Sequence, residues 1–138
     1  MPVDKISEEW VVMRYFREKY EHFPKGKLLK YESPDFVLVL NRKKRIGIEL
    51  TRLDYLLKDK IIIKDVSNQF LKLMDKKEAK LTAYRKNRLN AYWLIVTVDS
   101  FELLDVDNDK SLRQLDLNTS FDKVFLFDLF SAAIIELI

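Results

Sequence analysis

Residues 33–53, SPDFVLVLNRKKRIGIELTRL, contain the pattern that decides the fold. Two short runs rich in β-branched and aromatic residues, Phe36–Leu40 and Ile46–Leu50, stand on either side of the polar Asn41–Lys44. Two such runs joined by a short polar connection are typical of a β-hairpin. We therefore predict two antiparallel strands here, with a polar turn between them.

Each arm of the predicted hairpin carries one acid, Asp35 at the entrance of the first strand and Glu49 inside the second. Side chains alternate across a strand, so Arg45, Glu49 and Thr51 share one face. If Asp35 pairs opposite Glu49, which requires a turn with an odd number of residues, their Cβ atoms lie about 5 Å apart. Carboxylates that close repel each other unless a cation or a proton lies between them. A second interpretation makes Asp35 a turn residue and Glu49 an edge-strand charge paired with Arg45 or Lys44.

The composition is that of one folded domain. The chain has 138 residues, of which 48% are hydrophobic and 34% charged, and this balance excludes a disordered chain. No apolar run approaches the roughly 20 residues of a membrane-spanning helix. The N-terminal MPVDKISEEW also lacks the apolar core of a signal peptide. We therefore expect a single cytoplasmic domain over residues 1–138.

The residue types restrict the metal chemistry that is open to this chain. It has no cysteine, and its single histidine, His22, has no second histidine as a partner. Any metal must therefore be held by oxygen atoms. The net charge is +3, with lysines and arginines gathered in Lys25–Lys30, Arg42–Arg45 and Lys72–Arg88. Basic patches of this kind can follow phosphates, although solvation alone also explains a charged helix face.

A first amphipathic helix is predicted over Ile6–Phe23, with Ser7 as its N-cap. Its core-facing stripe, at three- and four-residue steps, consists of Ile6, Trp10, Met13, Phe16, Tyr20 and Phe23. At about 100° per residue, Glu9 falls near the middle of this stripe. An unpaired buried carboxylate is costly. Glu9 is therefore expected either to pair with a cation such as Arg45 or to join the acidic site of the hairpin.

A second, longer helix is predicted over Lys64–Arg88, after a segment, Arg52–Ile63, that we interpret as a loop with at most a helical turn. The apolar stripe of this helix consists of Val66, Phe70, Leu73, Met74, Leu81 and Tyr84. Lys77 lies close to the centre of the stripe and Lys80 on its flank. A lysine in that position either extends past the core to water or reaches the carboxylates.

Further strands complete a predicted sheet. Leu28–Tyr31 is a short strand before the hairpin, and the apolar run Ala91–Val98 is typical of a strand covered on both faces. Phe101–Thr119 indicates a short helix or loose cover. Lys123–Leu129 is another strand, with Ala132–Leu137 as its hairpin mate or a terminal helix. The expected fold is an α/β sandwich, a mixed sheet of about five or six strands flanked by helices.

The order of these elements resembles the core of the PD-(D/E)XK nuclease superfamily, whose fold is restriction-endonuclease-like. The resemblance covers Ile6 to Val98. It depends on a helix with an inward acid, on Pro34-Asp35 entering a strand, on a hairpin to Gly47–Thr51, and on a long lysine-bearing helix before a buried strand. The order and spacing of these elements support the resemblance more than the residue identities in the short motif do.

The resemblance implies a metal-dependent nuclease. Asp35 and Glu49 would bind a divalent cation, Glu9 would complete the site, and the metal would activate water to attack a phosphodiester. Hard carboxylate ligands suit Mg²⁺, or Mn²⁺ in its place. The partner expected on this basis is nucleic acid, DNA ahead of RNA, with no membrane partner and with a homodimer compatible with the sequence.

The chain departs from the family pattern at one position. The family carries a lysine two residues beyond the second acid, where this chain has Thr51, and a hydroxyl carries no positive charge. Some members resemble this chain in having the lysine on the following helix, which makes Lys77 the first candidate and Lys80 the second. The candidate catalytic residues are Asp35, Glu49, Lys77, Lys80 and Thr51.

Two other functions remain open. One is a catalytically weakened nuclease-fold domain that binds nucleic acid or a protein partner without cleavage. The other is a protein-interaction module whose basic helix meets an acidic partner.

Overall fold

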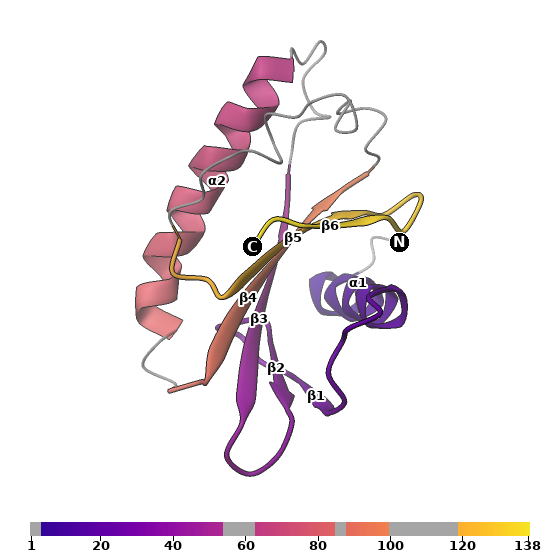
Figure 1. The fold of residues 1–138 in the computed structure, drawn as a ribbon, viewed down its shortest axis with the longest axis vertical. Helices are drawn as coiled ribbons and strands as arrows, with labels where there is room; N and C mark the ends of the chain where they lie inside the picture. The colour runs from indigo at the N-terminus through magenta and orange to yellow at the C-terminus, as the bar shows by residue number, and fades with distance from the viewer. Residues whose placement is uncertain (1–3, 54–62, 85–87, 100–118) are drawn as a thin grey trace.

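The computed structural model of the protein describes residues 4–53, 63–84, 88–99 and 119–138. Within these residues, six strands form one open mixed sheet, and two helices cover its opposite faces (Figure 1). In chain order the elements are α1 (Lys5–Lys19), β1 (Lys27–Lys30), β2 (Phe36–Val39), β3 (Arg45–Arg52), α2 (Ile63–Tyr84), β4 (Ala91–Val98), β5 (Lys123–Asp128) and β6 (Ile134–Glu136). The predicted α/β class and strand number are confirmed.

The strand order in the sheet follows the chain, β1-β2-β3-β4-β5-β6. β3, β4 and β5 are parallel, and the outer pairs β1–β2, β2–β3 and β5–β6 are antiparallel. The C-terminal hairpin is therefore present, and the terminal-helix alternative for 132–137 is wrong. The predictions for 52–63 and 101–119 lie almost wholly outside the described residues. Among those residues, no helix is long and apolar enough to cross a bilayer.

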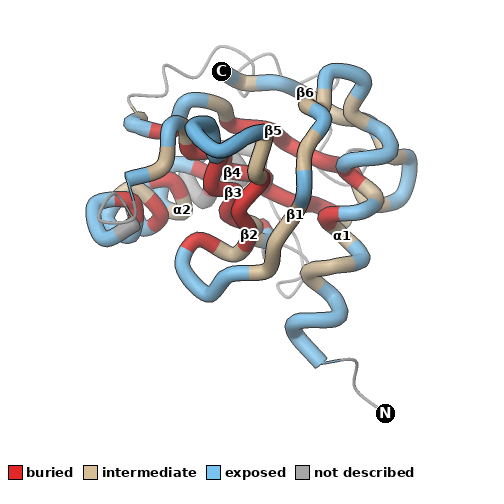
Figure 2. Tube along the Cα trace, turned by 90° about the horizontal axis from the view of Figure 1, so that it is seen from below, coloured by how far each residue is buried: buried red, intermediate tan, exposed pale blue. Residues whose placement is uncertain are grey.

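β4 is buried on both faces, as its apolar run predicts. Leu94 and Val96 pack with Phe70 of α2, whereas Ile95 packs with Phe16 of α1 on the other face. Figure 2 shows the buried residues concentrated along β3, β4 and β5, between the two helices. The alternation of side chains across the central strands thus supplies both halves of the core.

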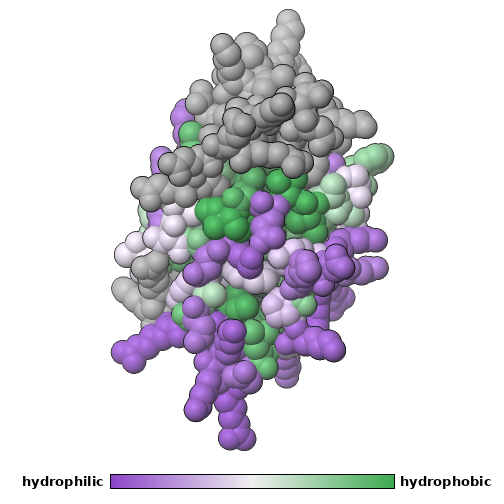
Figure 3. Space-filling model, viewed as in Figure 1, coloured by the Kyte–Doolittle hydropathy of each residue, from purple (hydrophilic) through white to green (hydrophobic). Residues whose placement is uncertain are grey.

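β2 and β3 form the predicted hairpin in the predicted register. Phe36 pairs with Ile48, so the connection between the strands has an odd number of residues. Continued by one residue, this register places Asp35 opposite Glu49, on the face that α2 covers. The basic turn 41–45 is exposed, and it lies at the hydrophilic lower end of the molecule in Figure 3. It is thus at the other end of β3 from the two acids.

α1 differs from its prediction at both ends. Its N-cap is Asp4, whose Oδ1 accepts the backbone N–H of Ser7 at 3.0 Å, so Ser7 lies inside the first turn and is not the cap. The helix ends at Lys19 rather than Phe23. Ile6 is 57% exposed instead of buried, because the first turns of α1 extend beyond the sheet (Figure 2).

α2 begins close to the predicted residue and ends earlier. It finishes at Tyr84 within the described residues, and 85–87 lie outside them. Phe70, Met74 and Leu81 of the predicted stripe are buried. The stripe positions Val66 and Tyr84 lie outside the residues whose side chains the structure describes.

β3 runs on past the start of β2, and this difference in length positions the site. β3 has eight residues and β2 four, and the pairing between them stops at Ile48. The segment Glu49–Arg52 therefore lies beyond β2. Side chains from the two faces of the sheet can meet there.

Candidate functional site

A pocket of about 300 Å³ lies where β3 extends past β2. Its walls come from α1, from the β1–β2 connection, from β3 and from α2. Five of the residues singled out in the sequence line this pocket: Glu9, Asp35, Glu49, Lys77 and Lys80. We call it the carboxylate pocket.

Asp35 lies at the centre of the hydrogen bonds in the carboxylate pocket. Its Oδ2 accepts the backbone N–H of Leu50 at 2.8 Å, and its carboxylate is hydrogen-bonded to those of Glu49 and Glu9. Burial by itself raises the pKa of Asp35, but these hydrogen bonds outweigh it and hold the pKa below its ordinary value. The predicted approach of Asp35 and Glu49 is confirmed.

Glu9 reaches the carboxylate pocket from the helix on the other face of the sheet. Burial, the hydrogen bond with Asp35 and the charge of Asp35 raise the pKa of Glu9 to about 7, although Lys30 and Lys5 oppose this shift. Below about pH 7 Glu9 is therefore protonated and hydrogen-bonded to Asp35, which stays ionised. The cation nearest to Glu9 is Lys30, with Nζ 3.8 Å from Oε1, and not Arg45. Glu9 thus joins the acidic site, as the second interpretation of the sequence expected.

Glu49 and Lys77 form the buried side of the carboxylate pocket. Their side chains are 4% and 11% exposed, and the ammonium of Lys77 lies 3.8 Å from Oε2 of Glu49. Burial lowers the pKa of Lys77, and the attraction of Glu49 offsets that effect only in part. Lys77 therefore reaches the carboxylates instead of extending past the core to water.

Lys30 is a residue of this site that the sequence analysis missed. Its Nζ donates to the carbonyl oxygens of Asp35, at 2.8 Å, and of Tyr31, and it lies 5.0 Å from the centroid of the Phe36 ring. These contacts hold the turn that leads into β2. The available signal was the pairing of β1 with β2, which places Lys30 opposite Phe36 and so beside Asp35.

Gly47 allows the segment before Asp35 to pack closely on β3. A Cβ atom at Gly47 would lie 2.9 Å from Cγ of Pro34 and 2.7 Å from Cδ1 of Leu89. Any larger residue would have to displace both of these side chains. The glycine thus contributes to the position of Asp35 through the proline that precedes it.

Thr51 is not in the carboxylate pocket. It lines a neighbouring cavity, and its carbonyl oxygen accepts the hydroxyl of Thr97 at 3.3 Å. Thr51 shares a strand face with Glu49, but it lies one full strand repeat further from Asp35. The position that carries a lysine in the family pattern is thus occupied here by a residue outside the pocket.

The expected metal set of Glu9, Asp35 and Glu49 is not assembled as such. In the described part of the chain, no group of three or more His, Cys, Asp or Glu side chains is arranged to hold a metal ion. Asp35 and Glu49 remain as a pair of adjacent oxygen donors, and Mg²⁺ is commonly held by one or two carboxylates together with water. These two residues fit such an ion.

A second glutamate–lysine pair lies at the β6 edge of the sheet. Nζ of Lys123 donates to Oε1 of Glu136 at 2.5 Å, and the two side chains are 37% and 38% exposed. The hydroxyl of Tyr20 donates to Oε2 of Glu136 at 3.4 Å. His22 is exposed beside Tyr20.

Comparison with protein-family models, with curated proteins and with solved structures found no match for this chain. The assignment of a function therefore depends on the geometry and electrostatics of the carboxylate pocket.

Proposed function

We propose that this protein is a metal-dependent nuclease of the PD-(D/E)XK type, with a restriction-endonuclease-like fold, and that it hydrolyses phosphodiester bonds in the carboxylate pocket. One observation carries the proposal. Two adjacent carboxylates, Asp35 and Glu49, and the buried ammonium of Lys77 meet at one pocket. Burying these charges together is unfavourable for folding alone, and perturbed ionisable groups in a pocket are typical of functional sites.

Asp35 and Glu49 are the residues that would hold Mg²⁺ or Mn²⁺. Such an ion, when bound, polarises a phosphoryl oxygen and lowers the pKa of a bound water. The carboxylates are held ready for this role by contacts of the chain itself. Leu50 N–H fixes Asp35, and the register of the hairpin fixes Glu49 beside it.

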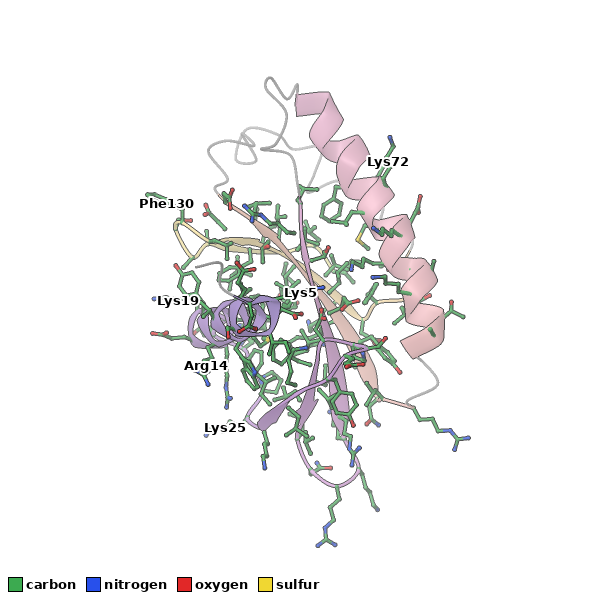
Figure 4. All side chains as sticks on the ribbon, turned by 180° about the vertical axis from the view of Figure 1, so that it is seen from behind. Lys5, Arg14, Lys19, Lys25, Lys72 and Phe130 are labelled. Atoms are coloured by element: carbon green, nitrogen blue, oxygen red, sulfur yellow. The ribbon has the colours of Figure 1, made fainter. Side chains whose placement is uncertain are left out.

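Lys77 supplies the positive charge that Thr51 cannot provide. Its stem lies against the sheet and its ammonium lies beside Glu49. In that position it would stabilise the negative charge that develops on the phosphate during attack. Lys5 and Lys80 line the same pocket, and Figure 4 shows Lys5 on the end of α1 that faces β3 and α2. Lysines at such a rim bind the phosphates on either side of the scissile bond.

Glu9 acts on Asp35 and not as a third ligand. Its proton relieves the repulsion between carboxylates when the pocket holds no cation. A divalent cation at Asp35 and Glu49 would therefore compete with that proton, and its binding is expected to strengthen as the pH rises through about 7.

The test is an incubation of the full chain with plasmid DNA, single-stranded DNA and RNA in the presence of Mg²⁺ or Mn²⁺. We expect cleavage that a chelator abolishes and that Glu49→Gln removes. Glu136→Gln, the same change in the exposed pair, is the matched control and should retain activity. Equal cleavage by wild type and Glu49→Gln, or no cleavage of any substrate, would reject the proposal.

One observation favours a second candidate, a nuclease-fold domain that binds nucleic acid without cutting it. Thr51 stands where the family pattern has its lysine, and Lys77 approaches Glu49 only to 3.8 Å. A positioned charge that is slightly too distant loses much of its catalytic effect. Nucleic-acid binding that Glu49→Gln does not weaken, with no cleavage by either protein, would select this function.

A further inference from the structure

A second cavity, of about 420 Å³, adjoins the carboxylate pocket. The two share three residues as a common wall: Lys5, Glu9 and Leu50. This volume falls within the roughly 300–1,000 Å³ of small-molecule sites. Apolar side chains from three elements line it: Val11 and Val12 of α1, Leu50 of β3, and Leu129 just after β5. We call it the apolar cavity.

Polar and charged residues also line the apolar cavity. They are Lys5, Glu8, Glu9, Thr51, Arg52 and Thr97. Arg52 is held in place by Asp99, with Nη2 3.0 Å from each carboxylate oxygen. The apolar cavity thus combines apolar walls with polar groups, which is the usual composition of a site for a small molecule or for one part of a larger ligand.

Leu50 connects the two sites physically. Its backbone N–H binds Asp35 in the carboxylate pocket, and the residue also lines the apolar cavity. Val11, at the mouth of the apolar cavity, is 65% exposed, so the mouth opens to solvent on the α1 face. A ligand with a phosphate beside the lysines of the carboxylate pocket and a planar apolar group attached nearby would occupy both sites at once.

We propose that the apolar cavity binds one unstacked base of the nucleic acid whose phosphate lies in the carboxylate pocket. The inference depends on the proposed function, and it specifies the substrate class as single-stranded nucleic acid. A base inside a duplex is stacked and paired on both sides, and it enters a side-chain pocket only after extrusion, at a cost of a few kcal/mol. A single strand presents its bases without that cost.

The test uses a single-stranded oligonucleotide carrying 2-aminopurine, with Lys77→Met as the background so that Asp35 and Glu49 still hold the metal while cleavage of the bound probe is slowed. We expect the 2-aminopurine fluorescence to change on binding. Val12→Trp, which fills the apolar cavity, should lower the affinity roughly 10- to 100-fold, the scale of losing one stacked base. Ile6→Trp is the matched control, because Ile6 is exposed on the same helix and does not line the apolar cavity.

A second variant guards against misfolding of Val12→Trp. Val11→Asp changes an exposed helix position, and its carboxylate at the mouth of the apolar cavity should weaken binding of the probe in the same way. In wild type, single strands should be cut faster than a blunt duplex of the same sequence.

The outcomes separate this inference from the proposed function. If wild type cuts no nucleic acid, the proposed function fails, and the inference fails with it. If Glu49-dependent cleavage is present but neither Val12→Trp nor Val11→Asp weakens binding, only the inference is overturned. Equal cutting of single strands and duplex would also overturn it.

Discussion

The two glutamate–lysine pairs of this protein are built from the same residue types and differ in nearly every other respect. Lys123 and Glu136 are more than a third exposed and approach to 2.5 Å. Lys77 and Glu49 are buried and approach only to 3.8 Å. The exposed pair is a close contact at the sheet edge that Tyr20 also joins, whereas the buried pair lies in a pocket with three further acids and with two further lysines, Lys5 and Lys80.

The pKa shifts of the two lysines run in opposite directions. The hydrogen bond to Glu136 raises the pKa of Lys123, whereas burial lowers the pKa of Lys77 despite the nearby Glu49. Water screens the exposed pair, so it contributes little to stability. Burial removes hydration from Lys77, and the ion pair with Glu49 offsets that loss only in part. The difference supports the proposal that Lys77 and Glu49 meet a ligand, whereas Lys123 and Glu136 join two strands.

The largest expected effect is on the cleavage rate, and it distinguishes Lys77 from Lys123. Lys77→Met should lower cleavage by a factor of about 10² or more, the scale of losing a positioned charge. Lys123→Met should leave cleavage unchanged. Initial rates on single-stranded DNA with Mg²⁺ measure both. If Lys77→Met cuts as well as wild type while Lys80→Met or Thr51→Ala abolishes cleavage, the assignment of the positive charge to Lys77 is wrong.

The stabilisation of the fold by a bound metal should depend on Glu49 and not on Glu136. A cation that binds only the folded state at about 100 times its Kd stabilises by about 2.7 kcal/mol, which corresponds to a rise in Tm of about 5–10 °C. Calorimetry with and without Mg²⁺ or Mn²⁺ measures this rise. Glu49→Gln should abolish it and Glu136→Gln should retain it. A rise that persists in Glu49→Gln would place the metal elsewhere.

The pH dependence of folding should report on Glu9. The pKa of Glu9 is raised from 4.5 to about 7 in the folded state, so the folded protein binds this proton more tightly than the unfolded chain. The resulting stabilisation is complete below pH 4.5 and is lost as the pH rises through about 7. Glu9→Gln should remove about 1–2 kcal/mol of this dependence, allowing for solvent screening.

Urea unfolding at about pH 5 and about pH 8 measures the change. Glu136→Gln is the control and should keep the wild-type slope. If Glu9→Gln keeps it as well, Glu9 does not hold a proton beside Asp35.

The smallest expected effect concerns the exposed pair itself. A double-mutant cycle on Lys123 and Glu136 should give a coupling of about 0.2–1 kcal/mol, and salt should reduce it. A coupling well above that range, insensitive to salt, would show that this contact is shielded from water. The two glutamate–lysine pairs would then differ in their position in the fold and not in their function.

The sequence alone was enough to predict the hairpin and the meeting of its two acids. The turn length and the alternation of side chains are local, and together they determine that Asp35 faces Glu49. The apolar period of α2 likewise placed Lys77 on the inner face of its helix. These predictions hold because each depends on residues close together in the chain.

The remainder of the site was decided by packing between distant segments. Glu9 reaches Asp35 from the opposite face of the sheet only because β3 extends past β2 while α1 extends past the sheet edge. The hydrophobic periodicity of the sequence does not determine how far β3 or α1 extends. For the same reason the prediction from the apolar stripe of α1 that Ile6 faces the core was wrong. A helical period reports which side of a helix is apolar, and only the tertiary structure decides how much of that side has a sheet beneath it.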